Sequence, residues 1–165
     1  MESLFQTVQE FVFGLPDPVQ FLGVTAVGAI PFVESYGAST IGIAAGVPIP
    51  LAVAAAITGN LLSVLLVVYG IASIRHRATA GRGDPGTEPG DGKRGRIARN
   101  VRRFGVPGAS LLGPLVLPTQ FTSAAMVGAG ANRNAVFAWT SVAVVVWGLA
   151  IGLASAGLLS VAGLI

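Results

Sequence analysis

The apolar positions of this chain gather in two long stretches, and neither stretch carries a charge. The first covers residues 50–74 and the second covers residues 134–164. At about 1.5 Å per residue, an α-helix over 50–74 extends roughly 36 Å, whereas the hydrocarbon core of a bilayer is about 30 Å thick. The pattern therefore predicts two transmembrane helices, over 50–74 and 134–164.

Each long stretch follows a shorter apolar segment that glycine and proline interrupt. Residues 19–47 contain Pro31, and residues 104–131 contain Pro114 and Pro118. Proline removes a helical hydrogen bond and bends or ends a helix, so two half-helices fit each segment better than one straight helix. We predict a re-entrant helical hairpin in each segment. The alternative is that each segment crosses the membrane once.

The two halves of the chain show the same order of elements. A shift of about 86 positions brings Glu34 onto Gln120 and Gly42 onto Gly128. A broken segment followed by a full helix, found twice, indicates an internal repeat. We therefore predict an all-α integral membrane protein with a single membrane domain, residues 1–165, built from two inverted repeats.

Two further segments complete the predicted layout. Residues 3–15 place apolar side chains on one helical face and polar ones on the other, which predicts an amphipathic helix at the membrane surface. Residues 75–103 hold nine of the ten basic residues. The positive-inside rule makes this basic loop cytoplasmic, with 93–103 as a helix along the lipid head groups. We expect a multi-pass protein of the inner membrane, with lipids as partners.

The position of Arg133 differs between the two topologies. If the broken segments are re-entrant, Arg133 lies inside with the basic loop and the N-terminal region lies outside. If each segment crosses once, both termini lie inside and Arg133 lies outside. The re-entrant topology accounts for every isolated charge, so we prefer it.

The composition excludes several classes of protein. Charged residues make up 10% of the chain and hydrophobic ones 53%, whereas soluble domains carry about a quarter charged residues. With no cysteine and one histidine, the chain offers no thiolate site, disulfide or zinc cluster. It shows no nucleophile and base pair and no phosphate loop. We expect no enzymatic activity, no metal, no cofactor and no nucleic-acid partner.

Glu34 is the main candidate for chemistry. It is the only charged residue between Val19 and Ile74, and a carboxylate in an apolar segment is costly unless it faces water or a partner. Desolvation favours the protonated form, which would let Glu34 load and release protons. The alternative is that Glu34 lies near the interface and binds loop backbone.

The two proline breaks supply further candidates. Pro31 and Pro118 would expose half-helix ends, which bind ions and polar groups. Polar side chains beside the breaks could line one cavity with Glu34, or could merely satisfy the broken backbone. These candidates are Ser35, Tyr36, Thr119, Gln120, Thr122 and Ser123.

Two supporting residues have alternative roles. Asn60 lies inside the first long helix, where its amide would seek a partner for packing or for transport. Arg133 is either a cytoplasmic anchor or the counter-charge of Glu34 or of an anionic substrate.

The predicted bundle is small, with two long helices and two hairpins. We therefore consider a homodimer as a possible assembly.

Several short motifs resemble the small multidrug export protein family, within the DedA superfamily of SNARE-associated and VTT-domain proteins. The first half carries Gly-Ala-Ile-Pro-Phe-Val-Glu-Ser-Tyr-Gly at 28–37, Gly-Val-Pro-Ile-Pro at 46–50 and Thr-Gly-Asn at 58–60. The second half carries Arg-Phe-Gly-Val-Pro-Gly at 103–108, Gly-Pro-Leu-Val-Leu-Pro-Thr at 113–119 and Val-Trp-Gly at 146–148. The resemblance covers 19 to about 160.

This resemblance implies two inverted re-entrant hairpins that face each other. It also implies transport driven by the proton-motive force, with flipping of undecaprenyl phosphate in bacteria and lipid scrambling in eukaryotes. The family's acidic residue of the first hairpin maps onto Glu34. Ser35 and Gln120 stand where relatives carry arginine, so recognition of an anionic phosphate does not carry over to these positions.

Two hypotheses follow. The first is a small transporter that depends on the proton-motive force and moves a lipid-linked or amphipathic substrate, by efflux or lipid flipping, with Glu34 as the proton site. The second is a non-transporting membrane protein that binds lipid or stabilises a complex.

Overall fold

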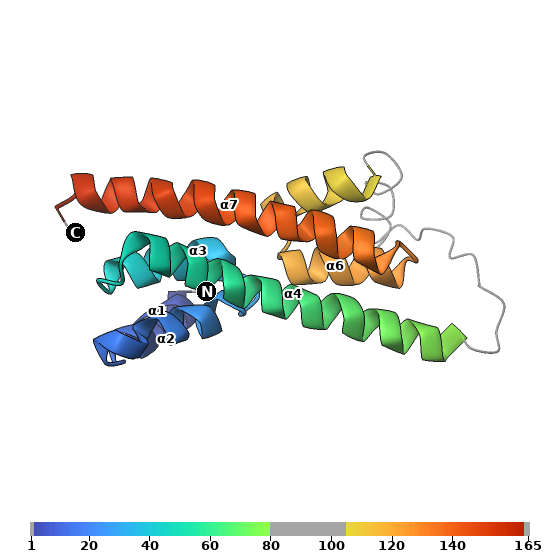
Figure 1. Cartoon of the computed structure of the whole chain (residues 1–165), viewed down its shortest axis with the longest axis horizontal. Coiled ribbons are helices and arrows are strands. Elements are labelled where there is room, and N and C mark those ends of the chain that lie inside the picture. The colour runs from blue at the N-terminus through green and yellow to red at the C-terminus, as the bar shows by residue number, and fades with distance from the viewer. Residues whose placement is uncertain (1, 80–104, 164–165) are drawn as a thin grey trace. The chain divides into compact units, whose positions relative to one another are not determined.

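The computed structural model describes residues 2–79 and 105–163, and within these residues every regular element is helical (Figure 1). The chain runs through α1 (Glu2–Phe13), η1 (Asp17–Val19), α2 (Gln20–Gly28), α3 (Glu34–Ala44) and α4 (Ile49–Thr79). After the basic segment it forms a helix over 105–112, then η2 (Gly113–Leu115), α6 (Thr119–Gly128) and α7 (Arg133–Val161). The predicted helix over 93–103 lies outside the described residues.

The first long helix is longer than the sequence pattern predicts. It begins at Ile49, and the carbonyl of Pro48 accepts a hydrogen bond from the amide of Ala52 at 2.9 Å. It continues to Thr79, so the predicted end at residue 74 is wrong. The charges that follow Ile74 do not break a helix, because basic side chains interact favourably with the carbonyl end of its dipole.

The second long helix begins with a side-chain cap. The Oδ1 atom of Asn132 accepts hydrogen bonds from the amides of Asn134, at 2.9 Å, and Ala135, at 3.1 Å. Asparagine is favoured at this position because its oxygen satisfies amides that have no helical partner. Asn132 therefore fixes the start of α7 at Arg133, one residue before the predicted start.

Both long helices are long and apolar enough to cross a membrane, by length and composition, over Ile49–Arg77 and Arg133–Val161. In the most apolar part of each, 44% and 28% of the residues are buried. The core helix of a soluble protein would be mostly buried, whereas here large apolar side chains face outward. Leu66 on α4 is 73% exposed and Leu158 on α7 is 72% exposed.

Contacts divide the chain into two compact units. The first unit comprises Met1–Ser63 with Val144–Ile165, and the second comprises Val64–Ala143. Both long helices therefore contribute residues to each unit.

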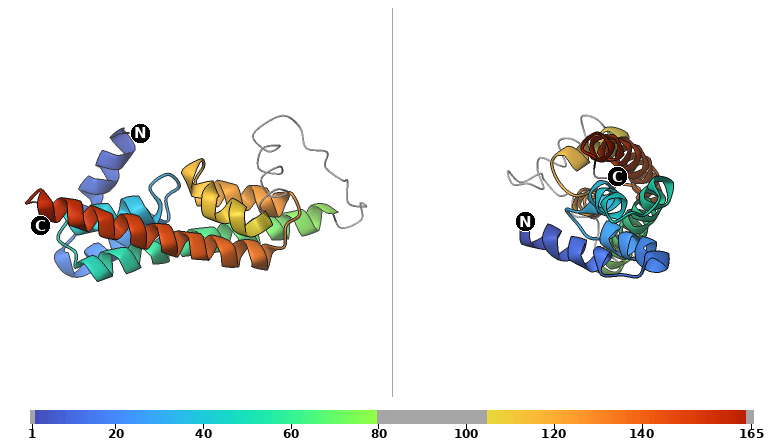
Figure 2. Two further views of the ribbon diagram at one scale, coloured as in Figure 1. Left: turned by 90° about the horizontal axis from the view of Figure 1, so that it is seen from above. Right: turned by 90° about the vertical axis from the view of Figure 1, so that its left-hand side faces the viewer.

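In the first unit, α2 and α3 pack against each other as a helical hairpin (Figure 2). Gly42 on α3 faces Val24 on α2, where an added Cβ would lie 2.7 Å from a Val24 methyl group. Helix α2 also crosses α4 closely, because a Cβ on Gly28 would lie 2.5 Å from the Ala56 carbonyl oxygen. A Cβ on Gly59 would collide with the Thr25 carbonyl. Glycine is what lets these two backbones approach.

Helix α1 corresponds to the predicted surface helix over 3–15 but ends at Phe13. It contacts both helices of the hairpin, and its Val8 and Val12 are buried in the core of the first unit. It also exposes apolar side chains, which are Leu4, Phe5, Phe11 and Phe13. Helix α1 thus packs against the protein with one face and presents a second apolar face outward.

The two short helices α3 and α6 end in the same way. At the end of α3, Gly46 has a φ of +90°, and the Val47 amide bonds the Gly42 carbonyl at 3.0 Å. At the end of α6, Gly130 has a φ of +97°, and the Ala131 amide bonds the Met126 carbonyl at 3.0 Å. Both are Schellman turns, in which glycine adopts the left-handed conformation that other residues avoid.

These turns give the local repeat an offset of 84 positions, from Gly46 to Gly130. The offset of about 86 expected from the sequence pairs Gly42 with Gly128 instead. The first residues of the two short helices, Glu34 and Thr119, are 85 positions apart, so no single offset aligns all the repeated positions. The repeated elements are thus a short helix, a break, a second short helix, a glycine turn and a long helix.

Candidate functional site

Glu34 is the first residue of α3 and is 1% exposed. The turn before it, residues 29–33, connects the two helices of the hairpin and contains Pro31. The Ile30 carbonyl accepts hydrogen bonds from the amides of Val33, at 3.2 Å, and Glu34, at 3.0 Å. The structure therefore places the predicted break at Pro31 directly before the buried carboxyl group.

One residue of this turn and the first residue of α3 have a left-handed backbone. Phe32 has a φ of +72° and Glu34 a φ of +52°. Such a conformation costs a non-glycine residue roughly 1–3 kcal/mol and persists only where the surroundings impose it. Residues of this kind cluster at functional sites, so the backbone marks Glu34 independently of its charge.

The polar residues that follow Glu34 form hydrogen bonds between α3 and α7. The Ser35 hydroxyl lies 3.4 Å from the Val144 carbonyl oxygen, which it approaches as a donor. The hydroxyls of Thr40 and Ser155 are 2.8 Å apart. Tyr36 is half-buried, and its carbonyl accepts a hydrogen bond from the Thr40 hydroxyl at 2.9 Å. The Ser35 hydroxyl thus contributes to packing beside the candidate proton site.

Small residues on α7 make this contact possible. A Cβ on Gly148 would lie 3.0 Å from the Ser35 Oγ, and one on Gly152 would lie 3.0 Å from the Ser39 Oγ. Glycines four residues apart form one groove along a helix face. The matching four-residue spacings of Gly148 and Gly152 and of Ser35 and Ser39 are the signal in the sequence that could have indicated this interface.

Asn60 is fully buried in the first unit, one residue after the close contact of Gly59 with α2. It belongs to the same compact unit as Glu34. Its complete burial is consistent with either the packing role or the transport role expected from the sequence.

The second break holds a buried polar cluster. Pro118 precedes α6 and is buried, as are the four polar residues Thr119, Gln120, Thr122 and Ser123. The Ser123 hydroxyl donates to the Thr119 carbonyl at 2.6 Å. The Thr119 hydroxyl lies 3.4 Å from the Gln120 Oε1 atom. The Ser123 hydroxyl therefore satisfies a backbone carbonyl beside the break. This is the alternative role expected for these polar side chains.

The second cluster belongs to the second unit, whereas Glu34 belongs to the first. That both line one cavity stays a prediction. Arg133 is exposed in the second unit, and its guanidinium carbon lies 5.6 Å from the centre of the Tyr69 ring. The Tyr69 hydroxyl donates to the Asn134 Oδ1 atom at 3.1 Å. Sequence reasoning did not identify Tyr69 as a partner of Arg133.

A hollow of about 340 Å³ lies in the first unit, and Glu34 is not among the residues that line it. It lies where the chain enters the hairpin at Asp17 and Gln20 and leaves it at Gly46 and Pro48. In the described part of the chain, no group of three or more histidine, aspartate or glutamate side chains could hold a metal ion.

No protein family, curated protein or solved structure matches this chain.

Proposed function

We propose that this chain is a transporter of the inner membrane that moves a lipid-linked or amphipathic molecule and uses Glu34 as its proton site. The observation that carries the proposal is the burial of Glu34 at a strained break inside the first hairpin. A buried ionisable residue in a membrane segment marks a substrate or proton pathway by default. The motifs that resemble the small multidrug export family support the same function.

The outward-facing side chains of α4 and α7 support a position in the membrane. Large exposed apolar side chains recur along α7 from Trp139 to Val161. A soluble monomer rarely exposes so continuous an apolar face. Lipid acyl chains would cover it without any protein partner.

The lengths of the short helices support re-entrant hairpins. Helix α2 has 9 residues and α3 has 11, so at about 1.5 Å per residue they extend roughly 14 and 17 Å. Neither reaches across a hydrocarbon core of about 30 Å. Asp17 and Pro48 line the same hollow, so the first hairpin begins and ends at one side.

The second hairpin ends beside the C-terminal part of α4. Its final turn at Gly130 lies against the guanidinium group of Arg75, near the end of α4. Arg133 follows and stacks on Tyr69 of α4. These contacts favour the topology in which Arg133 lies on the cytoplasmic side with the basic loop. We propose that the two hairpins enter the membrane from opposite faces, as inverted repeats require.

Flux in reconstituted vesicles tests the proposal. Wild type and Glu34→Gln are compared under a proton gradient, with undecaprenyl phosphate and a lipophilic cation as separate substrates. Glu10→Gln is the matched control, because Glu10 is an exposed acid on α1. We expect flux of one substrate in wild type and in Glu10→Gln, and its loss in Glu34→Gln.

Either of two results would refute the transport proposal. Folded wild-type protein could move neither substrate, or flux could persist unchanged in Glu34→Gln. The first result would favour the second hypothesis, a membrane protein that binds lipid or stabilises a complex.

A further inference from the structure

Positive charge gathers at one end of the second unit. Helix α4 exposes Ile74, at 65%, and then carries Arg75, His76 and Arg77 in succession. Helix α7 begins with Arg133. The described residues of this unit contain no aspartate or glutamate. The net charge of these described residues is therefore positive.

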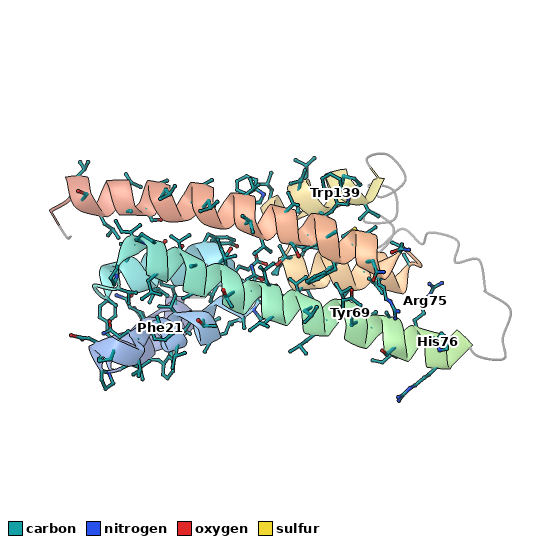
Figure 3. The ribbon with its side chains drawn as sticks, viewed as in Figure 1. Phe21, Tyr69, Arg75, His76 and Trp139 are labelled. Carbon is teal, nitrogen blue, oxygen red and sulfur yellow. The ribbon has the colours of Figure 1, made fainter. Side chains whose placement is uncertain are left out.

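Contacts fix two of the guanidinium groups near the turn that joins α6 to α7. Arg75 lies seven residues after the buried Val68, and therefore on the buried face of α4. A Cβ on Gly130 would lie 3.0 Å from an Arg75 guanidinium nitrogen, so Arg75 reaches the turn before α7 (Figure 3). Arg133, three residues later, stacks on the Tyr69 ring at 5.6 Å.

We propose that Arg75 and Arg133 bind the phosphate of an anionic lipid head group and that Tyr69 positions Arg133; the three residues are here called the arginine patch. A guanidinium group offers several N–H donors in a planar fork that matches phosphate oxygens. Stacking on Tyr69 holds the Arg133 fork in place, so less side-chain freedom is lost on binding.

The apolar surroundings select a lipid over a free anion. Ile74 is exposed directly before Arg75, and α7 exposes Trp139 within two turns of Arg133. Tryptophan and tyrosine concentrate at the boundary between hydrocarbon and head groups. Acyl chains would lie along the apolar side chains while the phosphate meets the arginines. The proposal rests on the membrane location under Proposed function but not on transport through Glu34.

Lipid titration of the purified full-length chain tests the patch. Native mass spectrometry in detergent measures binding of phosphatidylglycerol, phosphatidylcholine with the same acyl chains, and inorganic phosphate. One basic residue near an anionic membrane contributes about 1 kcal/mol, which corresponds to about fivefold in affinity. We therefore expect Arg133→Gln to weaken phosphatidylglycerol binding about fivefold. Arg133→Lys, which keeps the charge but loses the fork, should give a smaller loss.

Two further variants control for charge and folding. Arg77→Gln removes one positive charge from the exposed surface of α4, outside the patch, and should leave binding of phosphatidylglycerol unchanged. Arg75→Gln should weaken it as Arg133→Gln does. Circular dichroism identifies any variant that loses helical structure. If Arg133→Gln misfolds, the comparison of wild type with Arg133→Lys tests the patch instead. Binding of phosphatidylglycerol is measured without a proton gradient, which separates this proposal from transport.

Three results would overturn the proposal. Equal binding of phosphatidylglycerol and phosphatidylcholine by wild type would remove the requirement for an anionic head group. Equal losses in Arg77→Gln and Arg133→Gln would show a general charge effect. Complete competition by inorganic phosphate would show that the patch binds free anions and does not require a lipid.

Discussion

The hydroxyl of Thr40 on α3 lies 2.8 Å from the hydroxyl of Ser155 on α7. The two residues are 115 positions apart in the chain. This hydrogen bond ties the helix that begins with Glu34 to the end of the second long helix. It lies beside the close approach of Gly152 to Ser39, so small residues and a hydroxyl pair stabilise the same interface.

We expect the Thr40–Ser155 pair to contribute modestly to stability. Hydrogen bonds between membrane helices contribute about 0.6 kcal/mol on average and up to roughly 1.7 kcal/mol. Thr40→Val, Ser155→Ala and the double variant form a cycle, measured as the free energy of unfolding in mixed micelles. A coupling energy of zero would show that the hydroxyls do not interact in solution.

Gly59→Ala is expected to be strongly destabilising. The added methyl group would collide with the Thr25 carbonyl, and backbone cannot rotate away as a side chain does. Overpacking of this kind costs about 1–3 kcal/mol, and we expect a value at the upper end. The matched control is Gly70→Ala on the same helix, where nothing lies within 4 Å of the added Cβ.

Gly70→Ala should be neutral or stabilising by up to about 1 kcal/mol, since glycine within a helix is less stable than alanine. Thermal unfolding of both variants in one detergent measures the difference. Similar melting temperatures for Gly59→Ala and Gly70→Ala would contradict the close crossing of α2 and α4.

The two glycine turns should differ in their tolerance of alanine. Both Gly46 and Gly130 have a positive φ, and a left-handed backbone costs other residues about 1–2 kcal/mol. Nothing lies within 4 Å of a Cβ on Gly46, whereas one on Gly130 would press on Arg75. Gly130→Ala should therefore lower the melting temperature more than Gly46→Ala. The reverse order would show that Arg75 does not pack on the turn.

Cysteine labelling should place the two glycine turns on opposite faces of the membrane. The chain has no cysteine of its own. Ala44 and Ala129 are exposed beside the turns and suit the test, whereas Val47 is buried and would label poorly. An impermeant maleimide added to intact cells should modify Ala44→Cys at once and Ala129→Cys only after permeabilisation. Modification of both from the same face would rule out inverted hairpins.

The sequence pattern predicted some features of the candidate site and missed others. Pro31 and Pro118 predicted the breaks, and each break does precede a short helix with a buried polar residue at its start. The pattern missed Ser39, Thr40 and Ser155, because serine and threonine are common in apolar helices and their partners lie far away in the chain. It also did not reveal the left-handed backbone of Phe32 and Glu34, since neither residue type favours that conformation.

The sequence by itself determined the helical class, the two long apolar helices and the position of the one acidic residue among apolar segments. These features depend on local composition and on where glycine and proline interrupt the chain. Only the tertiary structure decided that Glu34 is buried, that Gly59 meets Thr25 and that Arg133 stacks on Tyr69. Contacts between distant residues depend on which helix faces pack together, and an apolar helix with little amphipathic pattern does not specify that face.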